Sequence, residues 1–357
     1  MKFSDYAAES RNRILGQLRI FLEQKSKELS PASRNPDELF QLLQEYSSSG
    51  KMLRGTLAML GYDLCKKRKF ASFSSAKAIR LAAAQELFQA GLLVHDDIMD
   101  GDATRRGKPT MHKVFEHTAL QAGRSSAEKL GEALGICAGD IFYFLAWQLL
   151  PSGARNLNQL FSDELSKVCL AQMQDVELGT SPTFPSMQEI INVYIYKTAR
   201  YTIAMPLLAG AMLAGNTELL APIETIGINL GIVFQLQDDY LGLYADEATL
   251  GKPLGSDIRE GKKTPFMVLL HDSLNKEEHV AFSRIFGNKS ITDDNVAYVR
   301  SLLEKYAIVD KVKAMMADLS KNAQTILQDK IFNSTSINHD SSSVLVDFIE
   351  YSSKRSF

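Results

Sequence analysis

Apolar residues recur every three or four positions along most of the chain. Between residues 11 and 29, Ile14, Leu18 and Phe21 form one stripe, the spacing that puts side chains on one face of an α-helix. The same pattern predicts helices over residues 39–46, 76–97, 127–150, 157–178, 187–214 and 217–244. Pro206 predicts a kink or break in the helix over 187–214. No βαβ rhythm and no series of hairpin-linked strands is present, so the pattern predicts an all-α fold.

Proline, glycine, serine and charged residues separate these segments. They cluster at residues 30–36, 101–109, 179–185 and 251–264, which we expect to be loops. No compositional break divides the chain and no short repeat is evident, so we expect one domain over residues 1–357. Residues 333–343 are rich in serine and asparagine and predict a mobile connection to a short terminal helix.

The composition narrows the classes of function. Apolar residues make up 45% and charged residues 23%, with a formal net charge of -2, so no positive excess favours nucleic-acid binding. The three cysteines form no CxxC pair, which argues against a zinc ribbon or a disulfide framework. Charged residues interrupt the N-terminal segment, and the longest apolar run, 203–215, holds a proline and is too short for a bilayer. We therefore expect a cytoplasmic protein with no membrane span.

An acidic cluster ends the helix predicted over 76–97. Asp96 and Asp100 are four residues apart, hence on one helix face, and Asp97 lies between them. Grouped carboxylates suit Mg²⁺ that also bridges to phosphate oxygens, although a helix end with solvated acids is the plain alternative. A calcium-binding EF-hand loop is excluded, because Ile98 and Gly107 stand at its third and twelfth positions.

A second acidic pair, Asp238 and Asp239, follows another long apolar helix 142 residues later. Two acid-ended helices of one bundle can face each other across a cavity and hold metal between them. Basic residues accompany both clusters: Lys51, Arg54, Arg105, Arg106, Lys252, Lys262 and Lys263. They are either partners in surface salt bridges or, with a metal, groups that bind diphosphates. No P-loop sequence is present.

The motifs GKMLRG, DDIMD, TRRGKP, AGD, AQMQD, YKT, FQLQDD and GKPLGSD follow one another in this order. In this respect the chain resembles the trans-prenyl diphosphate synthases, from about Gly50 to Thr264. The resemblance implies an isoprenoid-synthase bundle around a central cavity, Mg²⁺ as cofactor, and a homodimer. It also implies the head-to-tail condensation of isopentenyl diphosphate with an allylic diphosphate.

The resemblance further assigns roles by matched position. Magnesium binding or support falls to Asp96, Asp97, Asp100, Asp238 and Asp239, with Gln172 and Asp175 supporting the metal. Isopentenyl diphosphate binding falls to Lys51, Arg54, Gln89 and Arg106. The residues matched to contacts with the allylic diphosphate are Arg105, Lys197, Lys252 and Lys262. The residues matched to positions beside the developing carbocation are Thr198 and Gln235. Gly242 departs from the family pattern, because it replaces the last acid of the second motif, and we expect weaker metal support there.

Three residues of the helix over 76–97 bear on product length. Leu92 lies one turn before Asp96 on nearly its face, and Phe88 lies one turn deeper. Gly91 matches a family position often filled by an aromatic residue that stops elongation. We expect the growing hydrocarbon to extend into an apolar channel between the helices, and the missing side chain of Gly91 would widen this channel. We therefore expect a product longer than farnesyl diphosphate, with geranylgeranyl diphosphate favoured and Phe88 as the floor of the channel. Alternatively, Leu92 and Phe88 pack against neighbouring helices.

Two other functions remain open at this point. A class I terpene cyclase is also helical and magnesium-dependent, but the second acidic pair and the Lys51/Arg54 group argue against it. A non-catalytic subunit of a prenyl synthase is the other alternative. The retained acidic and basic residues argue against it, whereas Gly242 favours it.

Overall fold

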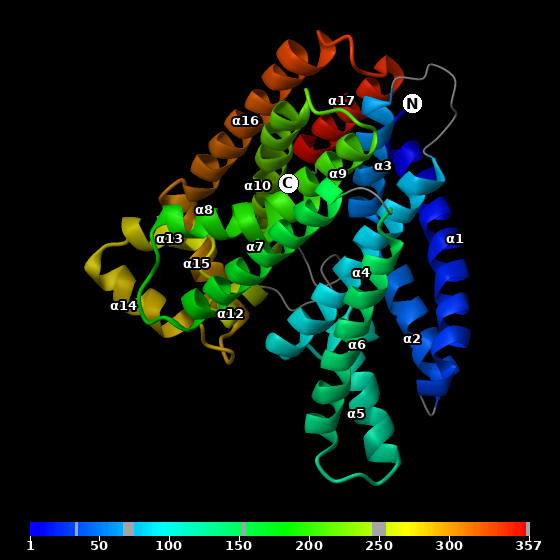
Figure 1. The fold of residues 1–357 in the computed structure, drawn as a ribbon. Helices are drawn as coiled ribbons and strands as arrows, with labels where there is room; N and C mark the ends of the chain where they lie inside the picture. Colours follow the sequence, from blue (N-terminus) through cyan, green and yellow to red (C-terminus); the bar gives the residue numbers. More distant parts are fainter. Residues whose placement is uncertain (33–34, 67–74, 152–154, 245–254, 355–357) are drawn as a thin grey trace. The chain divides into compact units, whose positions relative to one another are not determined.

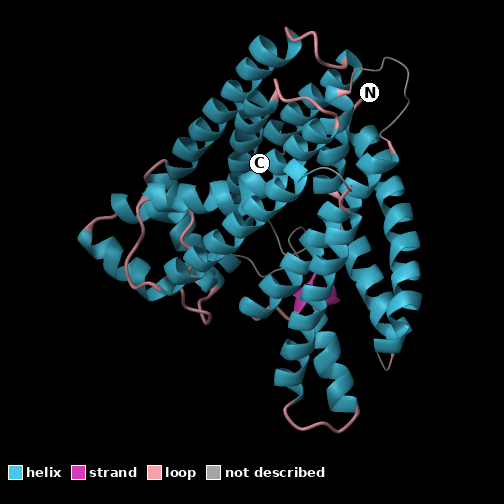
Figure 2. Cartoon of the chain, in the orientation of Figure 1, coloured by secondary structure: helices cyan, strands magenta, loops and turns pink. Residues whose placement is uncertain are grey.

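The computed structural model describes residues 1–32, 35–66, 75–151, 155–244 and 255–354. Within these residues helices dominate, and the one sheet is a two-stranded hairpin (Figure 1, Figure 2). The prediction of an all-α fold is therefore confirmed. Contacts divide the chain into two compact units: unit 1 comprises Met1–Asn158 and Ala209–Asn216, and unit 2 comprises Gln159–Leu208 and Thr217–Phe357. Each unit is described by itself.

Unit 1 is built around helix α4. Its elements are α1 (Phe3–Leu29), the 3-10 helix η1 (Ser30–Ala32), α2 (Pro36–Ser48), α3 (Leu53–Cys65), α4 (Ala76–Met99), β1 (Thr104–Arg105), β2 (Lys108–Pro109), α5 (Met111–Gln121) and α6 (Ala127–Leu149). Helix α4 packs against α1, α3 and α6. Its start is fixed by Ser75, whose side chain accepts a hydrogen bond from the backbone N–H of Ala78. Its other end carries the first acidic cluster.

The hairpin lies within the predicted loop 101–109. Thr104 pairs with Pro109 and Arg105 with Lys108. Arg106 and Gly107 form the turn with φ of 53° and 73°, and two-residue hairpin turns favour positive φ at both positions. Because this turn is tight, it fixes the directions of two successive arginines.

Helix α6 is, among the described residues, the one helix long and apolar enough to cross a membrane, and 39% of its most apolar stretch is buried within the protein. Its buried face packs against α4 and α5, as the buried face of a core helix does. Large apolar side chains of α6 are nevertheless exposed, among them Leu134, Ile136 and Phe144.

Unit 2 contains the second acidic pair, at the end of helix α10. Its elements are α7 (Arg155–Thr180), α8 (Met187–Val193), the π-helix η2 (Tyr194–Ala204), α9 (Met205–Leu213), α10 (Leu220–Tyr244), α12 (Ser256–Glu260), α13 (Pro265–Ser273), α14 (Lys276–Ile285), α15 (Asp293–Lys305), α16 (Ile308–Ile326), the π-helix η3 (Leu327–Phe332) and α17 (His339–Lys354). Residues of α7 up to Asn158 and of α9 from Ala209 belong to unit 1. Helix α10 packs against η2, α16, α12 and α17.

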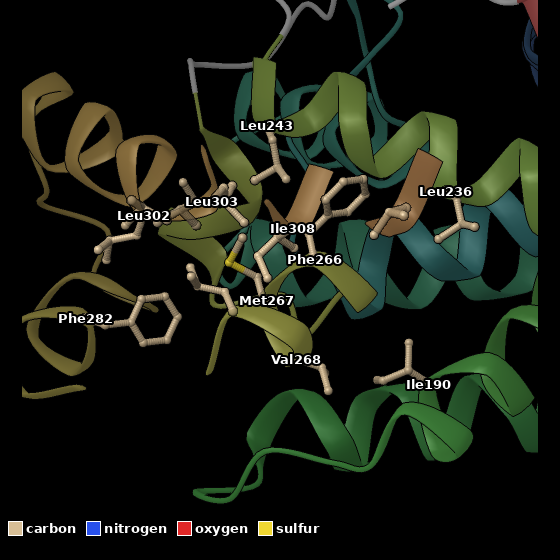
Figure 3. Close-up of a cluster of buried hydrophobic side chains, with 14 of the residues drawn as sticks. Ile190, Leu236, Leu243, Phe266, Met267, Val268, Phe282, Leu302, Leu303 and Ile308 are labelled. Carbon is tan, nitrogen blue, oxygen red and sulfur yellow. The ribbon is translucent and has the colours of Figure 1, made fainter. Parts of the chain in front are cut away.

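A buried hydrophobic cluster holds the acidic end of α10 in place. It joins Leu236 and Leu243 of α10 to Ile258 of α12, Phe266 of α13 and Ile308 of α16. In Figure 3 the side chains of Leu243, Phe266 and Ile308 lie together. Each of these five side chains is fully buried, so the cluster fixes the direction in which α10 presents its aspartates.

The kink or break expected at Pro206 takes the form of a change in helix type. Residues Tyr194–Ala204 form a π-helix, and the N–H of Met205 bonds to the carbonyl of Arg200, five residues earlier. Proline has no N–H, and its ring clashes with the carbonyl four residues before it. The wider π-helical turn ahead of Pro206 relieves that conflict while the helix continues into α9.

Some elements lie outside the predicted helices. Helices α3 and α5 and the helices α12 to α16 were not predicted, and α12 lies in the predicted loop 251–264. Helix α12 has five residues between Gly255 and Gly261, both at positive φ, so it is too short to show a periodic pattern. Helix α17 begins at His339, inside the range 333–343 predicted as a connection.

Candidate functional site

The first acidic cluster presents three aspartates at the end of α4 with different exposure. Asp100 is exposed, the side chain of Asp96 is 29% exposed, and that of Asp97 is fully buried. Asp96 and Asp100 are therefore accessible to an ion in solution, whereas Asp97 contacts protein groups. The supporting role that the resemblance assigns to Asp97 stays a prediction.

Both carboxylate oxygens of Asp97 accept hydrogen bonds. Tyr46 of α2 donates from its hydroxyl to Oδ2 at 2.7 Å, and Arg105 donates from Nε to Oδ1 at 2.5 Å. Burial raises the pKa of Asp97, and the charge of Arg105 and the Tyr46 hydrogen bond oppose that rise. Arg105 also reaches Asp96, with Nη2 at 3.7 Å from Oδ2. The sequence did not point to Tyr46, because its only signal there is one polar hydroxyl on an amphipathic helix.

Arg106 points to a different part of unit 1 from Arg105. Its Nη1 donates to the hydroxyl of Ser49 at 3.1 Å. An ideal Cβ added to Gly50 would lie 3.1 Å from the same Nη1, so Arg106 lies beside the GKMLRG segment. The hairpin thus brings Arg106 to the region of Lys51 and Arg54, three of the four residues assigned to isopentenyl diphosphate.

The start of α3 is anchored by a buried acid that the sequence analysis did not select. Glu86 of α4 accepts a 2.7 Å hydrogen bond from the backbone N–H of Gly55. Burial raises the pKa of Glu86, and the charges of Arg54 and Arg106 act in the opposite direction. Lys51 is exposed just before this helix, and Gln89 is half-buried one turn along α4 from Glu86. Glu86 therefore provides a buried carboxyl group that interacts with Arg54 and Arg106.

Gly91 does not leave open space beside α4. An ideal Cβ at this position would lie 2.6 Å from Cε1 of Tyr143 and 2.9 Å from the carbonyl oxygen of Gly139, both on α6. Such distances are closer than real Cβ contacts, so the missing side chain serves the close approach of α4 and α6. Its expected role in widening a channel is not supported, because Tyr143 fills that space.

Phe88 belongs to the same α4–α6 contact. It is fully buried, and its ring meets that of Trp147 edge-on at 5.2 Å between centroids and stacks with that of Tyr143 at 6.5 Å. Leu92 is half-buried. The packing of Phe88 is that of a core residue, and its assignment to the product channel stays a prediction.

The second acidic pair repeats the arrangement of the first. Asp238 is exposed and Asp239 is buried. The hydroxyl of Tyr194 donates to Oδ2 of Asp239, and Gln235 Nε2 donates to Oδ1 at 3.1 Å. Lys262 Nζ lies 3.6 Å from Oδ1. Burial raises the pKa of Asp239 to about 6, against the opposing charge of Lys262.

Small residues explain how α10 approaches η2 so closely. Gly227 and Gly231 lie four residues apart on α10, and an ideal Cβ on either would fall within 2.4 Å of the Cα of Ala204 or Ala199. Gln235 and Asp239 continue the same four-residue row along α10. The close helix contact therefore brings this row against Thr198, whose hydroxyl donates to Gln235 Oε1 at 2.9 Å.

The remaining assigned cations of unit 2 lie near carboxylates. Lys197 Nζ contacts Asp175 Oδ2 at 2.5 Å, and both side chains are about one third exposed. Burial alone lowers the pKa of Lys262, but Asp239, Asp257 and Asp175 raise it above its ordinary value. Lys252 lies outside the described residues. Gln172 is half-buried on α7, one turn before Asp175.

The donor set fits magnesium held jointly with a substrate. Within the described residues, no three His, Cys, Asp or Glu side chains group so as to hold a metal on their own. Asp96, Asp100 and Asp238 are accessible oxygen donors, and Mg²⁺ in proteins commonly takes one or two carboxylates and completes its shell with water and phosphate oxygens. The first and second acidic motifs lie in units 1 and 2, respectively.

Comparison with known proteins identifies related sequences and folds. The sequence matches the family described as polyprenyl synthetase over residues 36–303. It is 33% identical over 272 residues to a geranylgeranyl diphosphate synthase of Sulfolobus acidocaldarius, covering 74% of this chain and 76% of that protein. It is 30% identical over 289 residues to a short chain isoprenyl diphosphate synthase of Methanocaldococcus jannaschii, covering 79% and 81%.

A solved structure extends the likeness to the whole chain. A geranylgeranyl pyrophosphate synthase of Corynebacterium glutamicum, complexed with isoprenyl diphosphate and magnesium, superposes with a TM-score of 0.88. The sequence identity is 27%, and the match covers 100% of both chains.

Proposed function

The chain belongs to the polyprenyl synthetase family, and from this premise we propose that it is a magnesium-dependent enzyme that condenses isopentenyl diphosphate head-to-tail with an allylic diphosphate. The supporting observation is the repeated aspartate arrangement. In each acidic motif, one accessible aspartate adjoins a buried aspartate that a tyrosine hydroxyl and a cation hold. Two carboxylates prepared in this way suit metal-assisted departure of a diphosphate.

Asp96 and Asp100 of α4 and Asp238 of α10 would hold the magnesium ions. Bound Mg²⁺ neutralises the negative charge that grows on the departing diphosphate. Asp97 and Asp239, each held by protein hydrogen bonds, orient the neighbouring ligands rather than bind the metal directly.

Arg105, Lys197, Lys252 and Lys262 would bind the allylic diphosphate, and their charges favour the departing form over the bound ester. Thr198 and Gln235 lie next to Asp239 in one hydrogen-bonded row and present oxygen atoms that stabilise the developing carbocation. The double bond of isopentenyl diphosphate attacks that carbocation. A proton then leaves, and the released diphosphate accepts it.

Lys51, Arg54, Gln89 and Arg106 would bind isopentenyl diphosphate. The Arg106–Ser49 hydrogen bond and the Glu86–Gly55 hydrogen bond hold the segment that carries Lys51 and Arg54. Arginine forks and lysine ammonium groups are well matched to diphosphate oxygens.

Product analysis tests this function. The purified chain is incubated with Mg²⁺, labelled isopentenyl diphosphate and, in turn, dimethylallyl, geranyl or farnesyl diphosphate. We expect longer prenyl diphosphates, and their loss in Asp96→Asn. A hydrocarbon released without isopentenyl diphosphate would instead identify a cyclase. Turnover only after addition of a partner subunit would identify a non-catalytic subunit.

Geranylgeranyl diphosphate is the product we favour, in line with the names of two of the similar proteins. Phe88→Ala tests the proposed floor of the channel. A longer product from this variant would support the floor, whereas an unchanged product with lowered stability would place Phe88 in the helix packing alone.

Assembly and location complete the proposal. The exposed apolar side chains of α6, including Leu134 and Phe144, would be covered in a homodimer, which is measurable by light scattering after gel filtration. A monomer at all concentrations would contradict this. We also propose a cytoplasmic location, which fractionation of cells carrying the tagged chain would test.

A further inference from the structure

Arg200 of the π-helix η2 has no part in the proposed mechanism, yet it makes a close set of ionic contacts within unit 2. Its Nε and Nη2 donate to the two carboxylate oxygens of Glu164 on α7, each at 2.8 Å. Nη2 also lies 2.7 Å from Oε1 of Glu224 on α10. The guanidinium group of Arg200 therefore joins η2 to two other helices, α7 and α10.

The centre of this network is shielded from water. The side chains of Arg200 and Glu164 are 14% and 4% exposed. Burial by itself would raise the pKa of Glu164, but hydrogen bonds from Arg200 and Lys167 hold it below its ordinary value. The pair is therefore ionised, and its two parallel hydrogen bonds fix the orientation of the guanidinium group. Because apolar residues often replace a buried ion pair without loss of stability, the geometry that this pair imposes matters more than its energy.

That geometry bears on two residues of the proposed mechanism. Arg200 lies three residues after Lys197 and two after Thr198, inside the same π-helix. A π-helical turn is rare and wider than an α-helical one, and here the carbonyl of Arg200 accepts the N–H of Met205. The orientation of Arg200 thus determines the rotation of the turn that carries Lys197 and Thr198.

A second contact attaches η2 to the same face of α7. Lys197 reaches Asp175 at 2.5 Å. Asp175 and Glu164 are eleven residues apart on α7, which puts them on one face, about 16 Å apart along the axis. The helix η2 is therefore attached to this face at two separate points, and a one-residue shift of η2 along α7 would break these contacts.

We propose that Arg200 is a positioning residue, whose buried pairing with Glu164 fixes the register of η2. Held in this register, Lys197 faces the allylic diphosphate and Thr198 faces the developing carbocation. This inference rests on the proposed function. Loss of the pair should impair the allylic half of the reaction, whereas binding of isopentenyl diphosphate, which is assigned to residues of unit 1, should not change.

Three variants separate positioning from packing. Glu164→Gln removes the charge of the buried partner, and Arg200→Lys keeps the positive charge but loses the fork. The double variant Glu164→Met with Arg200→Met replaces the pair with unbranched apolar side chains. Glu278→Gln is the matched control, because Glu278 is also a buried acid of unit 2 and accepts hydrogen bonds from Lys305 and Tyr306.

Two readouts distinguish the substrates. Initial rates in the presence of Mg²⁺, with each substrate varied in turn, give kcat and a KM for each substrate. Calorimetry with an unreactive thiolodiphosphate analogue of the allylic substrate measures binding without turnover. Loss of folded protein lowers the amount of active enzyme and leaves both KM values unchanged, so a change in one KM reports positioning.

The expected results differ between the network and the control. Glu164→Gln, Arg200→Lys and the double variant should each lower kcat/KM for the allylic diphosphate by about 10- to 100-fold, since a misplacement of about 1 Å can cost that much. The same variants should weaken binding of the analogue and leave the KM for isopentenyl diphosphate unchanged. The double variant should nevertheless melt close to wild type. Glu278→Gln should lower the melting temperature and change neither KM.

The proposal is overturned if folded Glu164→Gln and Arg200→Lys keep the wild-type KM and kcat for the allylic diphosphate, because the pair would then act in packing alone. Equal rises of both KM values would also overturn it. If neither single variant folds, the double variant decides. Should that also fail to fold, Glu224→Gln, at a partner that is 38% exposed, decides by the ratio of the two KM values. Failure of the proposed function is distinct, because the wild-type chain would then show no turnover with any allylic primer.

Discussion

The hydroxyl of Tyr46 donates a 2.7 Å hydrogen bond to Oδ2 of Asp97, although 51 residues separate the two in the chain. Tyr194 donates in the same way to Asp239 across 45 residues. Both aspartates are fully buried, and each is the second of its pair. The two motifs therefore share one local plan, in which a tyrosine on a neighbouring helix fixes the inner acid while the outer acid stays accessible.

Tyr46→Phe removes one of these hydroxyls and little else. We expect a loss of about 1 kcal/mol in the free energy of unfolding, because a buried acceptor loses its donor. We also expect a higher Mg²⁺ requirement, since Asp97, without this hydrogen bond, would no longer orient the neighbouring magnesium ligands. Thermal melts and Mg²⁺ titrations of activity provide the measurement. Tyr62→Phe on α3 is the matched control, and equal effects of both changes would contradict the role given to Tyr46.

Asp239 should make stability depend on pH in a defined direction, and Asp239→Asn should remove that dependence. Burial raises the pKa of Asp239 from 3.8 to about 6, so between these values the folded protein keeps a proton that the unfolded chain releases. The native state therefore loses stability as pH rises from about 4 to 6, by at most about 3 kcal/mol. Above about pH 6 this loss does not grow further.

Asparagine has no ionisable carboxyl group, so the variant does not lose stability in this way. Melting temperatures of wild type and Asp239→Asn should thus diverge in favour of the variant as pH rises from about 4 to 6, while the variant loses activity. Parallel melting curves over that range would show that Asp239 titrates as in the unfolded chain.

Gly91→Ala should destabilise unit 1 rather than simply shorten the product. The added methyl group would press on Tyr143 and on the backbone of Gly139, and such overpacking costs about 1–3 kcal/mol. Gly16→Ala on α1 is the control: nothing lies within 4 Å of its added Cβ, and alanine there should gain about 0.5–1 kcal/mol. Denaturant unfolding of both variants measures the contrast. A stable Gly91→Ala would mean that α4 and α6 can separate without cost.

Phe348→Ala tests the contribution of α17 to unit 2. Phe348 is 2% exposed, and α17 packs against α10, where Gln237 Nε2 donates to the carbonyl of Ser352 at 2.6 Å. Truncating a buried phenylalanine costs about 3–5 kcal/mol, whereas Tyr351→Ala, at an exposed position on the same helix, should cost far less. Similar melting temperatures for the two variants would show that α17 contributes little to the stability of α10.

Helical periodicity predicted the long helices well, because α1, α4, α6 and α10 each carry several turns of apolar residues. It could not predict α12, whose five residues are set by glycines at both ends. The acidic pairs could be found from spacing alone. The groups that hold them could not, since Tyr46 and Tyr194 act through contacts between distant segments.

Gly91 shows how a glycine can be misinterpreted from the sequence. In the sequence, a missing side chain suggests free space. In the structure, a neighbouring side chain fills that space, and at Gly91 this neighbour is Tyr143. Gly242 repeats the lesson, because its neighbour is the Asp257 carboxylate. At a tightly packed position, a glycine indicates a close contact and leaves its partner unnamed.

The π-helix over Tyr194–Ala204 has a consequence for protein engineering. Its hydrogen bonds span five residues instead of four, so the segment contains more residues for its number of turns than an α-helix would. Deleting one residue there would let it relax into a regular α-helix and would turn the side chains ahead of the deletion around the axis relative to those beyond it. Lys197 and Thr198 could then no longer face Asp175 and Gln235 together, although every one of these four side chains would still be present.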